Sequence, residues 1–173
     1  MAISQPWAAA VAANRFGLGA RPGDLARIGS GGRDWLMRQL AGGAPRLDAG
    51  SLRGSADLLR EAVALRDERR EQKRGNPDVE VAMKLGEVYR PAYAEEIAAR
   101  FRAAVASERP FVERLVHFWS NHFAVSIDKI AVLGLAGPFE REAIRPNVLG
   151  NFADLLRAVE QHPAMLIYLD NYL

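Results

Sequence analysis

The most distinctive stretch of the sequence is PFVERLVHFWSNHF, residues 110–123. Proline is well tolerated at the first position of a helix, so Pro110 predicts a helix start. Apolar side chains recur at Phe111, Leu115 and Phe118, three and four residues apart, which is the spacing of one helix face. We therefore expect one amphipathic helix here, with the rest of the fold packed around it.

Residue usage over the whole chain favours helix over sheet. The 173 residues include 29 alanines and 19 leucines, against 7 isoleucines, 12 valines and no threonine. Alanine and leucine lose little freedom in a helix, whereas β-branched side chains suit strands. We predict an all-α fold, an irregular bundle of about eight helices, some of them short. The absence of cysteine excludes disulfides, thiolate metal sites and a cysteine nucleophile.

Glycine and proline divide the chain. Residues 42–54 hold four glycines and one proline, the composition of a linker. We therefore predict a Gly-rich helical arm and linker over residues 1–54 and a main helical bundle over residues 55–173. The length suits one continuous domain. Within the bundle, Pro91 predicts a kink or a restart in the helix that begins at Pro77.

Charge and hydropathy limit the partners. The chain carries 23 Lys and Arg against 21 Asp and Glu, a net charge of +2. Because there is no dense basic face, we predict no nucleic-acid binding. No apolar run reaches the ~18–20 residues that a membrane span needs, so we predict no span. Residues 1–15 do not resemble a signal peptide, which predicts a cytoplasmic location.

The sequence has only three histidines. His117 and His122 are about 140° apart around a helix, so one face cannot offer both to one metal ion. His117 shares a polar stripe with Glu113, whose carboxylate could orient it as a general base or a metal ligand. The alternative is a surface pair or a buried polar clamp. We expect His122 in the core and His162 as the cap of the last helix.

The FEREAIR segment, residues 139–145, supplies the third candidate, Glu142. Paired carboxylates can perform acid–base catalysis or bind a metal ion, although interhelical ion pairs are the alternative. Glu142 with Arg145, or Arg141 with Arg145, is expected to face the 110–123 helix. We predict no cofactor, and a divalent metal ion is the alternative that Glu113 and His117 would support.

Two apolar features of the sequence are expected to be buried by packing. Phe118, Trp119 and Phe123 have helical spacing among aliphatic residues, so we expect them in the core. The last run, MLIYLDNYL, is apolar on several faces and has no glycine cap or closing basic residue. Such a helix must bury its surface in this domain, against another chain, or against a longer continuation of the same chain. We predict a homo-oligomer or a partner chain bound through Met165–Leu173.

Three strings carry a family resemblance: AANRFGLGARPGDL, ERLVHFWSNHFAVSIDK and FEREAIRPNVLGNFADLLRAVEQHPAMLIYLDN. In this order, over Ala12 to Asn171, the chain resembles the bacterial family called domain of unknown function 1800. The resemblance implies a helical protein of several hundred residues, secreted or cytoplasmic, of which this chain is similar to the amino-terminal part. It implies no established activity. Where members often have a histidine after the IRP string, this chain has Asn147.

Two functions fit these observations. The first is a non-enzymatic helical scaffold or protein-interaction module that docks through its last helix. The alternative is the amino-terminal half of a metal-assisted, hydrolase-like enzyme to which Glu113, His117 and Glu142 contribute. We expect no activity from this chain alone. Convergence of the three side chains in an open pocket would favour the enzyme.

Overall fold

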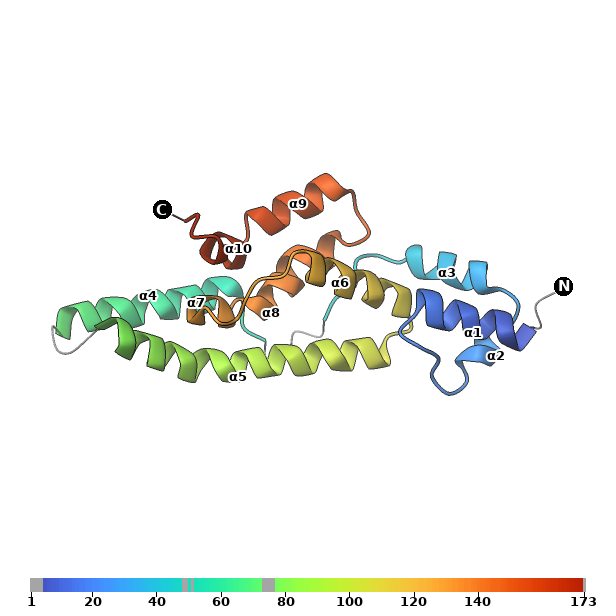
Figure 1. Cartoon of the computed structure of the whole chain (residues 1–173), viewed down its shortest axis with the longest axis horizontal. Coiled ribbons are helices and arrows are strands. Elements are labelled where there is room, and N and C mark those ends of the chain that lie inside the picture. The colour runs from blue at the N-terminus through green and yellow to red at the C-terminus, as the bar shows by residue number, and fades with distance from the viewer. Residues whose placement is uncertain (1–4, 48–49, 51, 73–76, 173) are drawn as a thin grey trace.

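The computed structural model describes residues 5–47, 50, 52–72 and 77–172 (Figure 1). Within these ranges the chain is helical and contains no strand, which confirms the predicted all-α, multi-helix fold. The elements are α1 (Gln5–Phe16), α2 (Asp24–Ile28), α3 (Gly32–Leu40), α4 (Ser55–Gln72), α5 (Pro77–Ala106), α6 (Pro110–His122), α7 (Ile130–Leu133), α8 (Ala136–Phe139), the π-helix η1 (Glu140–Ile144), the 3-10 turn η2 (Arg145–Asn147), α9 (Phe152–Glu160) and α10 (Pro163–Tyr168).

Helix α5 is the axis of the molecule, with 30 residues. Helix α4 runs beside its first half, α1–α3 lie at the opposite end, and α6–α10 fold over the middle (Figure 1). The main core forms where α4 and α5 meet α7–α10 and η1. Its buried members are Leu58, Val81, Leu85, Tyr89, Leu133, Leu135, Phe139, Ala143, Ile144, Leu155, Val159, Ala164 and Met165.

Pro91 lies inside α5, and the helix continues through it without a restart. A proline removes one backbone hydrogen bond and usually costs a helix interior about 3 kcal/mol. Here Pro91 and the residue four positions earlier, Glu87, are both exposed, so the unpaired carbonyl lies on the solvent side of the helix. Packing of both halves of α5 against its neighbours then holds the two halves together as one helix.

The amino-terminal arm is attached to α6 by two arginines that bind helix carboxyl ends. Arg109 donates to the carbonyl oxygens of Gln39, Gly42 and Gly43 at 2.7–3.1 Å, just after α3. Arg114 donates to Asn14 and Gly17 carbonyls at the end of α1. Cations suit this end of a helix, where carbonyls lack intrahelical partners. The division into an arm (residues 1–54) and a bundle stays a prediction, and residues 1–4, 48–49 and 51 lie outside the described ranges.

The last helix ends within the structure, although the sequence offers neither a glycine cap nor a closing basic residue there. Asp170 adopts a left-handed φ of 56°. The amide of Asn171 donates to Leu166 O at 2.8 Å, and the amide of Asp170 to Ile167 O at 3.3 Å. This is a Schellman termination with aspartate where glycine is commoner. Lys129 closes it by donating to Ile167 O at 2.7 Å and pairing with the Asp170 carboxylate.

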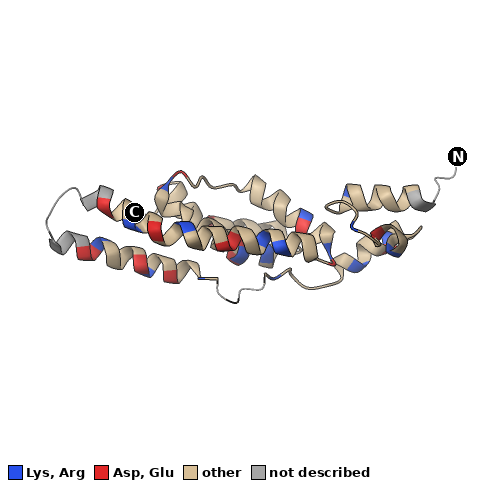
Figure 2. Cartoon of the chain, turned by 90° about the horizontal axis from the view of Figure 1, so that it is seen from below, with Lys and Arg blue, Asp and Glu red and all other residues tan. Residues whose placement is uncertain are grey.

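Among the helices that the structure describes, none is long and apolar enough to cross a bilayer. Acidic and basic residues are interspersed along the helices (Figure 2).

Candidate functional site

A buried ion-pair network joins α6 to the π-helix, and Arg145 is its centre. Arg145 is 1% exposed. Its two terminal nitrogens each donate to one oxygen of Glu113 at 3.0 Å, a bidentate pair. Its Nε donates to Glu140 Oε1, also at 3.0 Å. Glu113 therefore has both carboxylate oxygens bound to an arginine, the geometry in which such pairs are strongest.

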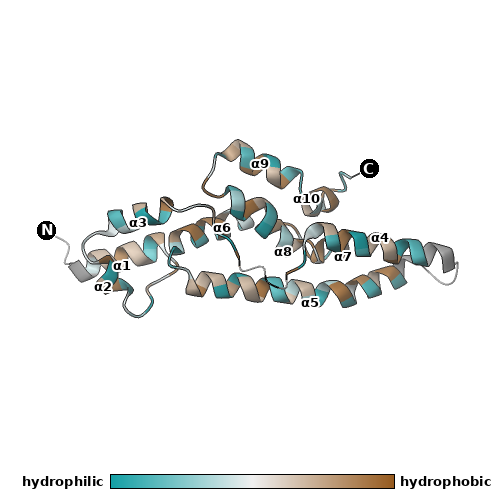
Figure 3. Cartoon of the chain, turned by 180° about the vertical axis from the view of Figure 1, so that it is seen from behind, coloured by the Kyte–Doolittle hydropathy of each residue, from teal (hydrophilic) through white to brown (hydrophobic). Residues whose placement is uncertain are grey.

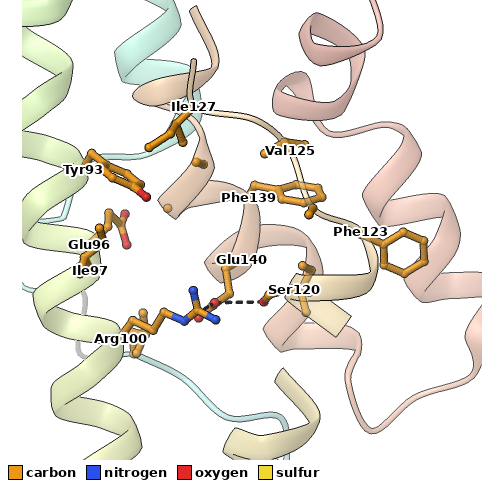
Figure 4. Close-up of a pocket in the computed structure, with 15 residues that line it drawn as sticks. Tyr93, Glu96, Ile97, Arg100, Ser120, Phe123, Val125, Ile127, Phe139 and Glu140 are labelled. Atoms are coloured by element: carbon orange, nitrogen blue, oxygen red, sulfur yellow. Dashed lines mark hydrogen bonds and ion pairs between the residues drawn. The ribbon is translucent and has the colours of Figure 1, made fainter. Parts of the chain in front are cut away.

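The network continues from Glu140 to His117. Glu140 Oε2 accepts a hydrogen bond from Ser120 Oγ at 3.0 Å (Figure 4). It also lies 2.9 Å from Arg100 Nε, an ion pair without hydrogen-bond alignment. A terminal nitrogen of Arg100 lies 2.7 Å from His117 Nδ1. The guanidinium can only donate, so Nδ1 accepts and the ring proton of a neutral His117 is on Nε2.

The environment of His117 favours its neutral form. Burial lowers the pKa of His117 below its ordinary value, and the nearby Arg100 charge lowers this pKa further. His117 and Glu113 share α6, but they are connected through Arg145, Glu140 and Arg100 rather than by a direct contact. A polar clamp between helices describes this arrangement better than a carboxylate-oriented base.

The π-helix explains which side chains of the FEREAIR segment face α6. In a π-helix the backbone bond spans five residues, and the Arg145 amide donates to Glu140 O. Glu140 and Arg145 therefore lie on one side and meet α6. The expectation that Glu142 or Arg141 faces α6 with Arg145 was wrong, because the wider turn directs those two side chains toward other elements. Arg141 instead binds Glu96 on α5.

Glu142 accepts two hydrogen bonds from Ser55, the first residue of α4. Its Oε1 accepts from the Ser55 amide at 3.0 Å, and its Oε2 accepts from the Ser55 hydroxyl at 2.6 Å. His162 Nε2 lies 3.3 Å from the same Oε2. The other ring nitrogen, Nδ1, accepts from the Ala164 amide at 3.1 Å, which confirms His162 as the cap of α10. Glu142 thus connects α4, η1 and α10.

Protonation of Glu142 in acid should weaken its contacts with Ser55 and His162. Burial alone would raise the pKa of Glu142, but hydrogen bonds from His162 and Ser55 outweigh it and lower this pKa to about 2. A carboxylate with a depressed pKa contributes stability above about pH 4.5, and this contribution disappears as the pH falls toward 2. We expect Glu142→Gln to lower the free energy of unfolding by about 1–2 kcal/mol at pH 7, and the difference from wild type to vanish in acid.

Thermal unfolding between pH 7 and pH 2 measures this difference. His117 has a lowered pKa, so its contribution also falls as the pH drops below about 6.5. That loss is common to both proteins and cancels in the comparison. Glu160→Gln changes an exposed carboxylate on α9 and is the matched control. A Glu142→Gln profile that stays parallel to wild type at every pH would contradict this assignment.

The structure does not gather Glu113, His117 and Glu142 into one pocket. Among the residues that it describes, no three His, Cys, Asp or Glu side chains are grouped as metal ligands. A divalent metal at Glu113 and His117 stays a hypothesis, and so do catalytic roles for the three candidates.

Sequence reasoning missed an exposed aromatic cluster on α6 and α9. Phe118 is 56% exposed and His122 is also exposed, so the prediction that both lie in the core was wrong. Trp119 is half-buried between them, with ring centroids 5.0 Å from Phe118 and 5.7 Å from Phe152 of α9. Helical spacing predicted that these rings pack together, but it could not show that Phe118 and His122 stay uncovered by the helices that the structure describes.

A second apolar feature lies at the carboxyl-terminal end. A groove of about 310 Å³ runs between α4, α5, α7 and α10. The ribbon of α10 is mostly in the hydrophobic colour in Figure 3. Its lining is Leu59, Ala62, Val63, Arg66, Leu85, Tyr89, Ala131, Pro163, Leu166, Ile167 and Tyr172. Arg66 is the only charged side chain in this lining.

The fold and these sites define an all-helical protein whose polar groups form interhelical ion pairs beside an open apolar groove. The chain belongs to the family described as "Protein of unknown function (DUF1800)", which matches residues 11–173 and confirms the resemblance. No curated protein and no solved structure matches the chain.

Proposed function

We propose that this chain is a helical scaffold that associates with a second copy of itself through α10 and the neighbouring groove. The observation that carries the proposal is the apolar groove with exposed apolar side chains at its edge. Leu166 and Ile167 line one wall, and Val63 of α4 lies on the other. Leu169, just after α10, is 55% exposed. Contiguous apolar surface of this kind is typical of binding sites.

The use of the polar residues supports a scaffold over an enzyme. Arg145 binds both oxygens of Glu113, and Ser55 and His162 bind Glu142. These carboxylates already stabilise contacts between helices. Interspersed surface charge favours a protein partner over a nucleic acid (Figure 2). A chain without cysteine also suits the cytoplasm, which we propose as its location.

The proposed interface uses most of the predicted Met165–Leu173 segment. Met165 is buried in the core, whereas Tyr168, Leu169 and Tyr172 are exposed. Leu173 lies outside the described residues. The segment is thus anchored on one side and open on the other, as an interface helix must be.

Light scattering coupled to size exclusion tests the proposal. We expect the wild-type mass to rise from monomer toward dimer as the concentration increases to about 100 µM. Leu169→Asp places a charge in the interface and should keep the protein monomeric. Val105→Asp is the matched control, because Val105 is 70% exposed on α5 near the arm. A wild-type monomer at every concentration would refute self-association, as would equal dimerisation of the two variants.

A further inference from the structure

A cavity of about 150 Å³ lies between α5, α6, α8, η1 and the loop at residues 123–128. Ala124 and Ile127 of that loop line it and are exposed, so the loop forms its mouth. The cavity shares no lining residue with the apolar groove. A ligand in this cavity would therefore not occupy the surface proposed for self-association.

Glu96 on α5 is a carboxylate of this cavity with only one of its two oxygens bound by an arginine. It is 5% exposed. Arg141 binds it through two nitrogens, at 2.8 and 3.2 Å, but both bonds go to Oε1. No donor from the described part of the chain binds Oε2, and the carboxylate points into the cavity (Figure 4). This oxygen is accessible from the cavity, so a ligand inside the cavity can donate to it.

Close packing between α8 and α5 restricts the position of the Glu96 side chain. A Cβ added at Gly137 of α8 would lie 2.3 Å from Glu96 Cγ. Only a residue without a side chain lets α8 approach α5 this closely. The carboxylate is thus held in one place by Arg141 and by close backbone packing.

The walls around Glu96 are apolar and aromatic. The rings of Tyr93 and Phe139 lie on either side of the space that Glu96 faces, and Ile127 lies above them (Figure 4). Ring faces attract cations, most strongly where water is excluded. A carboxylate flanked by two rings is a favourable environment for an organic ammonium group.

At the opposite end of the cavity the carboxylate of Glu140 already has partners. There, Glu140 binds Ser120 at 3.0 Å and Arg145 at 3.0 Å, and Arg100 lies 2.9 Å away. The π-helix places Glu140 at this wall, and π-turns are frequent at functional sites. A ligand would therefore place its polar head at Glu96 and its apolar body against the remaining walls.

We propose that this cavity binds a small organic ammonium ion with an apolar body no larger than one ring. Glu96 Oε2 accepts the ammonium protons, and Tyr93 and Phe139 pack against the body. The size limit follows from the volume, because a cavity of about 150 Å³ holds benzene.

Cyclopentylamine and its neutral isostere cyclopentanol are suitable probes. Their binding to the wild-type protein can be measured from the changes in backbone amide chemical shifts. We expect the amine to bind with a Kd of about 0.1–1 mM and the alcohol at least tenfold more weakly. The shifted amides should include those of Tyr93, Glu96 and Gly137. Equal binding of the two probes, or shifts confined to another region, would overturn the proposal.

Two variants test the residues. Glu96→Gln should weaken amine binding at least tenfold, whereas Glu160→Gln, an exposed control, should leave it unchanged. Because Glu96→Gln also weakens the pair with Arg141, Ile127→Trp is the second variant. It narrows the mouth from an exposed position and should abolish binding of both probes. Unchanged amine binding in either site variant would overturn the proposal.

Discussion

Replacing Arg145 by methionine is expected to lower the free energy of unfolding by about 3–5 kcal/mol. Methionine fills much of the same space but leaves two buried carboxylates, Glu113 and Glu140, without their shared cation. Breaking a buried pair from one side leaves an uncompensated charge, which costs far more than removing the pair entirely. Urea unfolding followed by circular dichroism measures the loss.

The matched control is Arg157→Met. Arg157 also pairs with an acid, Asp154, but its side chain is mostly exposed, so little change is expected. A triple variant that adds Glu113→Gln and Glu140→Gln to Arg145→Met should recover part of the loss, since the uncompensated charges are gone. If Arg145→Met is as mild as Arg157→Met, the network does not stabilise the fold.

The second large effect concerns Gly134, between α7 and α8. A Cβ at this position would lie 2.5 Å from two ring carbons of Tyr89, which is buried in the core and donates to Leu58 O at 3.2 Å. The ring cannot move without breaking that packing. We expect Gly134→Ala to cost about 2–3 kcal/mol, measured by thermal unfolding.

The backbone of Gly134 makes this test specific. Its φ of −70° and ψ of −20° are helical and suit alanine, so any loss comes from the clash and not from the backbone. Gly43→Ala is the control, because a Cβ there meets nothing within 4 Å. A Gly134→Ala protein as stable as Gly43→Ala would show that the close approach of Tyr89 is not maintained in solution.

Local signals in the sequence predicted the helices well. Pro110 begins α6, and His162 with Pro163 begins α10, because capping and proline geometry act over a few residues. Other features depend on tertiary context. The helix does not restart at Pro91, because the exposed position tolerates the lost bond, and Asp170 ends α10 in a conformation that glycine more often adopts.

The candidate site was predictable only in part. The polar stripe of Glu113 and His117 is real, but its partners come from other elements. Arg145 faces α6, as expected, but its companion there is Glu140 and not Glu142 or Arg141. The π-turn changes the register of the segment, and a four-residue spacing rule cannot anticipate that change. Glu96 drew no attention in the sequence, since its burial depends on the close approach of Gly137.

Because α5 is one continuous helix, it determines the distance between the apolar groove and the amino-terminal arm. At a rise of about 1.5 Å per residue, Leu85, which lines the groove, and Val105, near the arm, are about 30 Å apart along one rigid helix. A subunit bound in the groove would therefore leave the α1–α3 end uncovered. Each copy in a pair joined at α10 would therefore keep its arm about 30 Å from the shared interface and available to a further partner.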